Sequence, residues 1–216
     1  MKKQEKILMG KGYQNLKRVI DAAMATVGLV LLSPVLYTVA FLVRVTSYGD
    51  IVYYDTRVGL GGKKIRVLKF RTMYADANTH PERYMTKEQL SVYERERKVD
   101  DDPRQTPLGR FLRKTSLDEL PQLINIIRGD ISFVGNRPIT EKELSLYYTE
   151  SDRALLYEMR PGLTGYWQAY GRSEVSFASG KRQEMDMLYA RNASFSLDMR
   201  IFFRTFYAVF ALKGAK

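Results

Sequence analysis

An uncharged apolar run with a proline at its centre constrains this 216-residue chain more than any other feature. The run extends from Ala22 to Val43 and would be about 33 Å long as one helix, which is enough for a single membrane span. Ser33-Pro34 lies at its midpoint, where the proline removes a helical hydrogen bond and kinks the helix. A signal peptide is a poor alternative, because "RVTSYGD" follows the run and contains no small-x-small cleavage site.

Basic residues flank the run on both sides. Before it stand Lys2, Lys3, Lys6, Lys11, Lys17 and Arg18, and after it stand Arg44, Arg57, Lys63, Lys64, Arg66, Lys69 and Arg71. A spanning helix normally has its excess of Lys and Arg on the cytoplasmic side only. Two arms of about 16 Å that meet at Ser33-Pro34 would reach the bilayer midplane and return. The charge symmetry therefore favours a re-entrant membrane helix over a kinked span.

Composition excludes several kinds of chemistry. The chain has no cysteine, which rules out disulfides, thiolate catalysis and cysteine-based zinc sites. His80 is the only histidine, so a multi-histidine metal site is impossible and a Ser–His triad is a weak hypothesis. The formal net charge of +11 indicates a polyanionic partner, which could be an anionic membrane or a phosphorylated small molecule. The apolar run argues against a soluble nucleic-acid binder.

The sequence pattern of the rest of the chain indicates one compact domain. "DIVYYDTRVGLGGKKIRVLKFRTM" is typical of a β-hairpin whose turn contains Gly59, Gly61 and Gly62, and it lacks the spacing of a phosphate-binding loop. We further expect an exposed helix and a loop within 76–105, a helix over 119–128, a strand at 131–135 and a helix over 140–159. The loop 160–173 and a C-terminal helix, either in the core or at the membrane interface, complete the domain.

The predicted fold is α+β and mostly helical. Residues 1–46 form a basic N-terminus and a re-entrant membrane helix broken at Ser33-Pro34, and residues 47–216 form a compact cytoplasmic domain with a small β-hairpin and membrane-proximal helices.

Two adjacent acids, Asp118 and Glu119, stand out in the basic stretch "KTSLDELPQLINIIRGD". Ser116 and Glu119 have the spacing of a capping box, so the pair could simply begin a helix. Pro121 complicates that interpretation, because it would fall at the fifth helical position if Ser116 were the N-cap. With Asp118 as the N-cap, Pro121 would be harmless. Local sequence leaves capping and chemistry both open.

Taken in order, the basic N-terminus, the proline-broken run, "KFRTM", "SLDELPQL", "GDISFVGNRP", "RPGLTGYWQAYGR" and "SLDMRIFF" resemble the bacterial sugar transferase family, the monotopic phosphoglycosyl transferases. The resemblance covers about Lys17 to Leu212. It implies an enzyme that moves a sugar 1-phosphate from a UDP-sugar to polyprenol (undecaprenyl) phosphate, with Mg²⁺ as cofactor and release of UMP. Such an enzyme starts the membrane assembly of an exopolysaccharide, a capsule or another glycoconjugate.

The resemblance also assigns roles to residues. Asp118 would be the nucleophile that carries the phosphosugar, and Glu119 would be its partner, with both acids as candidate Mg²⁺ ligands. Substrate charge needs neutralisation when a carboxylate attacks a diphosphate. The candidates for this role are Lys69, Arg71, Arg113, Arg137, Arg160 and Arg172. The family usually has Pro-Arg-Pro where this chain has Asn136-Arg137-Pro138, which makes the order of that loop less certain than its role.

The expected partners are the UDP-sugar, polyprenol phosphate and anionic lipids of the inner membrane, with the catalytic domain on its cytoplasmic face and no nucleic acid. The sugar, the polymer and the oligomeric state stay open, a homo-oligomer included. Two alternatives remain. Polyprenol phosphate could attack directly, with Asp118 and Glu119 as metal ligands only, or the chain could be a non-catalytic basic anchor for acidic partners.

Overall fold

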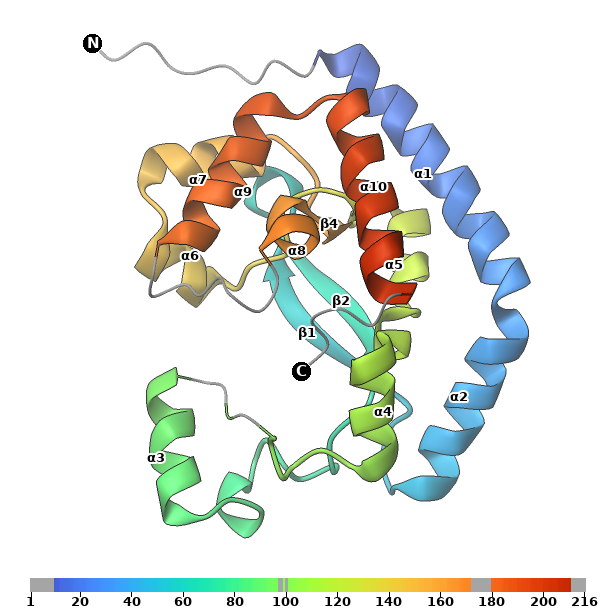
Figure 1. The fold of residues 1–216 in the computed structure, drawn as a ribbon, viewed down its shortest axis with the longest axis vertical. Coiled ribbons are helices and arrows are strands. Elements are labelled where there is room, and N and C mark those ends of the chain that lie inside the picture. Colours follow the sequence, from blue (N-terminus) through green and yellow to red (C-terminus); the bar gives the residue numbers. More distant parts are fainter. Residues whose placement is uncertain (1–9, 97–98, 100, 172–179, 211–216) are drawn as a thin grey trace. The chain divides into compact units, whose positions relative to one another are not determined.

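The computed structural model describes residues 10–96, 99, 101–171 and 180–210. The α-helices are α1 (Lys11–Leu31), α2 (Ser33–Thr46), α3 (Lys87–Glu96), α4 (Pro107–Thr115), α5 (Gln122–Arg128), α6 (Glu141–Tyr147), α7 (Glu150–Tyr157), α8 (Tyr166–Tyr170), α9 (Lys181–Asn192) and α10 (Phe195–Phe210). The strands are β1 (Val52–Val58), β2 (Lys64–Phe70), β3 (Ser132–Val134) and β4 (Gly162–Thr164), and the 3-10 helices are η1 (Leu60–Gly62), η2 (Pro81–Arg83) and η3 (Leu117–Glu119) (Figure 1). The fold is mostly helical α+β, as predicted.

The chain forms two compact units. Unit 1 comprises residues 1–31, 54–68 and 122–216, and unit 2 comprises residues 32–53 and 69–121. Each unit therefore combines segments that lie far apart in the sequence. The predicted domain boundary after residue 46 stays a prediction.

The apolar run forms α1 and α2, which are separated by Leu32 and bent by 64° at this break. Pro34 lies in the first turn of α2, where its missing N–H removes no hydrogen bond. Within the described residues, neither helix alone is long and apolar enough to cross a membrane, but the bent pair meets the requirement for length and composition. The predicted break at Ser33-Pro34 is confirmed to within one residue.

The predicted hairpin is also confirmed, because β1 and β2 pair in a two-stranded sheet. Gly61 and Gly62 have φ angles of 67° and 75°, in the left-handed region that favours glycine. A fully buried side chain, Asn125 of α5, continues the backbone pairing of β2. Its amide donates to the Arg66 carbonyl at 2.7 Å, and its Oδ1 accepts from the Leu68 N–H at 2.9 Å.

A second small sheet forms the centre of unit 1. β3 and β4 are parallel, with Ser132 opposite Gly162 and Val134 opposite Thr164. The segment 160–173, which we predicted as a loop, therefore contains a strand and the short helix α8. The prediction was wrong because three-residue strands carry no readable period. The backbones of Gly162 and Gly135 can approach closely because Gly162 has no side chain. A Cβ at Gly162 would lie only 2.1 Å from the Gly135 nitrogen.

The single helix predicted over 140–159 is instead two helices, α6 and α7. Thr140 and Thr149 each cap a helix, and each forms a capping box with the acid three residues later, Glu143 and Asp152. The second capping box starts a new helix where the apolar period suggested continuation.

Helix α10 has a buried face and an exposed apolar face, so its packing in the core is established and its place at a membrane interface stays a prediction. Ile201 is fully buried in the core of unit 1, whereas Phe203 and Tyr207 are 67% and 65% exposed.

The N-terminal helix α1 packs beside α5 in the same unit (Figure 1). Arg18 of α1 donates to the carbonyls of Ile126 and Ile127 at the C-terminal end of α5.

Unit 2 has its own hydrophobic core. Val39 and Val43 of α2 pack with Phe70 of β2 and Leu112 of α4. Helix α2, the second half of the apolar run, therefore belongs to the core of the unit that contains α4 and η3. The helix predicted within 76–105 is confirmed as α3, and none of residues 87–93 of it is buried.

Candidate active site

Asp118 and Glu119 lie in η3, a single 3-10 turn between α4 and α5. The capping box that we considered is absent, because Ser116 ends α4 in a left-handed conformation (φ 59°) and its side chain caps nothing in η3. Pro121 precedes α5, so it interrupts no helix. The acids are thus presented by a tight turn and not by the first turn of a longer helix, which explains how adjacent residues acquire different surroundings.

The two acids of the pair differ in burial and in charge environment. Asp118 is 6% exposed, and burial raises the pKa of its carboxyl from 3.8 to about 6, with a further rise from the neighbouring charge of Glu119. The positive charges of Lys69 and Arg113 lower that pKa in part. The environment of Asp118 is therefore unfavourable for the charge of its carboxylate, and the two cations offset only part of that effect.

Glu119 is more exposed and is paired. Its Oε1 accepts from Lys69 Nζ at 2.6 Å, and each of these side chains is 26% exposed. Lys69 belongs to strand β2 of the hairpin, and it contacts the turn η3 that carries both acids within unit 2. The structure therefore brings together four of the predicted residues: Asp118, Glu119, Lys69 and Arg113.

Arg113 of α4 lies close enough to Asp118 for its charge to lower the pKa of that carboxyl. Its Nε donates to Thr72 Oγ1 at 2.9 Å, and the described residues offer its terminal nitrogens NH1 and NH2 no hydrogen-bond partner. The positive charge of Arg113 stabilises the ionised form of Asp118. A guanidinium held by Nε leaves the outer fork available for a phosphate.

The acidic pair suits Mg²⁺ as a minimal protein site. Mg²⁺ usually takes one or two protein carboxylates and completes its shell with substrate phosphates and water. Asp118 and Glu119 supply that number, and no cluster of three or more metal-ligating side chains occurs among residues 10–96, 99, 101–171 and 180–210. The donor set therefore fits a metal that binds together with a diphosphate.

Arg71 contacts the segment of unit 2 that directly follows α2. Its NH2 donates to the Ser47 carbonyl at 2.7 Å and to Ser47 Oγ at 2.9 Å, immediately after α2. Its role in phosphate binding stays a prediction. What the structure adds is a structural contact at the end of the helix that follows the Ser33-Pro34 break.

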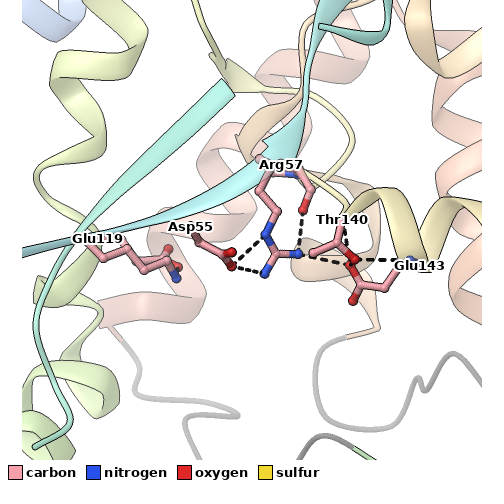
Figure 2. A network of polar contacts seen from close by, with 7 residues as sticks. Asp55, Arg57, Glu119, Thr140 and Glu143 are labelled. Atoms are coloured by element: carbon pink, nitrogen blue, oxygen red, sulfur yellow. Dashed lines mark hydrogen bonds and ion pairs between the residues drawn. The ribbon is translucent and has the colours of Figure 1, made fainter. Parts of the chain in front are cut away.

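Arg137 lies in unit 1, next to Pro138, whose carbonyl accepts from Arg57. Figure 2 shows the polar network in which Arg57 lies between Asp55 and Glu143. Arg57 donates to Asp55 at 2.5 and 2.8 Å, to Glu143 at 3.1 Å and to the carbonyl of Pro138 at 3.3 Å. The backbone immediately after Arg137 is thereby fixed.

The Arg137 side chain belongs to a partly buried cluster around Trp167. The guanidiniums of Arg137 and Arg182 lie 5.9 and 4.6 Å from the centre of the indole ring. Asp186 is fully buried near both arginines, and burial raises the pKa of its carboxyl to about 6. Tyr148 donates to Asp186 at 2.7 Å. This cluster orients Arg137, which is consistent with a role in binding an anion.

The remaining predicted cations lie elsewhere or cannot be placed. Arg160 Nε donates to the Gly129 carbonyl at 3.0 Å, beside the C-terminal end of α5. Arg172 lies outside the described residues. Sequence reasoning missed Thr72, Arg182 and Asp186. The i, i+4 spacing of Arg182 and Asp186 was a readable signal. Thr72 lies within the segment "KFRTM" that carries part of the family resemblance, but no pattern singled out its hydroxyl.

Comparison with known proteins decides the family. The model of the bacterial sugar transferase family matches residues 12–212. The chain belongs to this family.

Among similar members, the exopolysaccharide production protein ExoY of Sinorhizobium fredii is 43% identical over 202 residues, covering 92% of this chain and 87% of that protein. The undecaprenyl-phosphate galactose phosphotransferase of Salmonella typhimurium is 36% identical over 202 residues (93% of this chain, 41% of that protein). The UDP-glucose:undecaprenyl-phosphate glucose-1-phosphate transferase of Escherichia coli is 38% identical over 204 residues (93% and 41%). This sugar transferase thus spans most of one relative and less than half of the other two.

Proposed function

We propose that this sugar transferase is a membrane-associated enzyme that moves a sugar 1-phosphate from a UDP-sugar to undecaprenyl phosphate in exopolysaccharide or capsule synthesis. The names of its relatives support the reaction class: one is an exopolysaccharide production protein and two act on undecaprenyl phosphate. The bent apolar pair α1–α2 supports a place at the membrane, where the lipid substrate resides.

The observation that carries the mechanism is the buried Asp118 with Lys69 and Arg113 as its nearby cations. In the first step, a carboxylate oxygen of Asp118 attacks the β-phosphorus of the UDP-sugar. A bond forms between that oxygen and phosphorus, the bond from phosphorus to the bridging oxygen breaks, and UMP leaves with the electron pair. Mg²⁺, when bound at Asp118 and Glu119, would neutralise diphosphate charge. Lys69 and Arg113 hold the phosphoryl oxygens.

In the second step, a phosphate oxygen of undecaprenyl phosphate attacks the phosphorus of the phosphosugar ester. The bond to Asp118 breaks, the carboxylate is restored, and the product is undecaprenyl diphosphate sugar. The two-step route divides one difficult displacement between anions into two displacements at a preorganised site. The N-terminus and the catalytic residues share the cytoplasmic face in this proposal, because the membrane helix turns back at Ser33-Pro34.

Trapping the intermediate tests the covalent route. Purified enzyme is mixed with a UDP-sugar labelled in the sugar, with Mg²⁺ and without undecaprenyl phosphate. We expect a burst of about one UMP per active enzyme and a labelled peptide that contains Asp118, and neither in Asp118→Asn. Direct attack by the lipid predicts no UMP before undecaprenyl phosphate is added, and a non-catalytic anchor predicts none at any stage. Repeating the assay with a panel of UDP-sugars identifies the sugar.

A further inference from the structure

The segment after β2 lies against the start of α4 in unit 2. The Thr72 carbonyl accepts from the Thr106 N–H at 3.0 Å, and Met73 pairs with Gln105 in an antiparallel bridge. Thr106 in turn caps α4, because its side chain accepts from the Gly109 N–H at 2.9 Å. The backbone of Thr72 and the first turn of α4 are thereby held together.

Gly109 makes this contact unusually close. A Cβ at this position would lie 1.9 Å from the Thr72 carbonyl oxygen, so any larger residue would push α4 away. Arg113 follows Gly109 by four residues and therefore lies on the same face of the helix, one turn further on. The close approach at Gly109 places the Thr72 hydroxyl within reach of Arg113.

The hydroxyl contacts one nitrogen of the guanidinium only. Thr72 is buried (6% exposed), and its Oγ1 accepts from Arg113 Nε at 2.9 Å. Arg113 itself is exposed, so its long side chain would otherwise sample many rotamers. The bond at Nε fixes the plane of the guanidinium and leaves NH1 and NH2 without a hydrogen-bond partner among the described residues, on the arginine whose positive charge lowers the pKa of Asp118.

We propose that Thr72 is a positioning residue for the transfer reaction, which acts through Arg113 by aiming its terminal nitrogens at the phosphate that Asp118 attacks. The proposal rests on the proposed function of Asp118. Thr72 needs no contact with the substrate, and its backbone contact with Thr106 is separate from its side-chain role.

Thr72→Val tests this role, because valine keeps the shape of threonine and the backbone contact but cannot accept from Arg113. Loss of a hydrogen bond to a charged group should lower kcat/KM for the UDP-sugar by about 10- to 100-fold in the UMP-release assay. Thr72→Ser retains the hydroxyl and should remain within about threefold of the wild type. Thr79→Val removes a hydroxyl elsewhere in unit 2 and serves as a matched control with normal activity.

A double-mutant cycle with Arg113→Met separates positioning from a general structural effect. If Thr72 acts through Arg113, adding Thr72→Val to Arg113→Met should change kcat/KM by less than about twofold. A Thr72→Val enzyme within twofold of the wild type would overturn the proposal, as would an undiminished further loss in the Arg113→Met background.

Thermal unfolding of each variant shows whether it is folded, and Thr72→Ala replaces Thr72→Val in the cycle if the valine variant is not. Unfolding of both would show that the hydroxyl serves the fold and would also overturn the proposal. Failure of the proposed function is distinguishable, because then the wild type would form no Asp118 adduct or Asp118→Asn would remain active.

Discussion

Asp118 occupies a position in unit 2 where burial opposes the charge that the proposed reaction requires. In the metal-free protein the pKa of the Asp118 carboxyl is about 6, compared with 3.8 in the unfolded chain. The native state therefore binds a proton at this carboxyl more tightly than the unfolded state does. The free energy of unfolding should therefore fall as the pH rises from about 4 to about 6. Above that window the ionised carboxylate costs about 3 kcal/mol, at about 1.4 kcal/mol per pH unit.

Asp118→Asn should consequently abolish turnover and yet stabilise the protein. We expect no UMP release above background, because an amide cannot accept the phosphosugar, and a higher melting temperature than that of the wild type at pH 8 in the presence of a chelator. The difference in melting temperature should disappear near pH 4, where the wild-type carboxyl is protonated. Retention of a tenth of the wild-type rate would exclude Asp118 as the nucleophile.

Arg137 is expected to recognise phosphate by its planar fork. Arg137→Lys keeps the charge but loses both the fork and the stacking on Trp167, so kcat/KM should fall about 10- to 100-fold. Arg66→Lys is the matched control, since Arg66 also lies over an aromatic ring, 4.8 Å from the centre of Tyr54, but in an exposed position. Equal kinetics of the two variants in the UMP-release assay would argue that Arg137 has no special role.

At the scale of elements, the break between α1 and α2 is the feature on which the proposed membrane topology rests. The bend at Leu32 and the basic residues on both sides of the run agree with a helix that enters the membrane and turns back. Helix α2 then returns directly into the core of unit 2 through Val39 and Val43. A re-entrant helix would thus connect the membrane to the unit that contains the acidic turn.

Single cysteines can test that topology, because the chain has none of its own. Lys3→Cys and Lys87→Cys, made separately, should both resist a membrane-impermeant thiol reagent in intact cells and react after lysis. Labelling of Lys3→Cys in intact cells would show that the helix pair spans the membrane. Lys87→Cys in the body of the protein reports whether the cells are sealed.

At the scale of the whole molecule, the two ends of the described chain meet within unit 1. Asp198 of α10 is 1% exposed and accepts from Tyr13 at 2.8 Å and Lys17 at 2.6 Å on α1, and from Tyr189 at 2.7 Å on α9. This carboxylate joins three helices, one of which leads into the predicted membrane segment.

Asp198→Asn should therefore destabilise the protein by about 3 kcal/mol, because it leaves the ammonium of Lys17, whose side chain is only 15% exposed, without its counter-charge. Lys17→Gln removes the charge on the other side and should cost less, since Tyr13 and Tyr189 still donate to the carboxylate. Chemical denaturation in detergent measures both values. A smaller loss for Asp198→Asn than for Lys17→Gln would contradict the assigned role of the carboxylate.

The sequence by itself determined the helix break, the glycine turn of the hairpin, helix α3 and the acidic pair, because each depends on neighbours within a few residues. A proline in an apolar run or three glycines between two β-branched runs restrict the backbone whatever lies around them. The resemblance to the bacterial sugar transferases added the roles of Asp118 and Glu119, which local pattern had left between capping and chemistry.

Only the tertiary structure decided which cations lie beside the acids and which residues hold them. Lys69 and Arg113 come from β2 and α4, and they meet Asp118 and Glu119 through the packing of unit 2. The parallel pair β3–β4 and the hydroxyl of Thr72 were equally invisible, because a three-residue strand and a single threonine have no periodic signal. Contacts between segments distant in the sequence are set by burial and close packing, as at Gly109 against Thr72, and a one-dimensional pattern does not encode that distance.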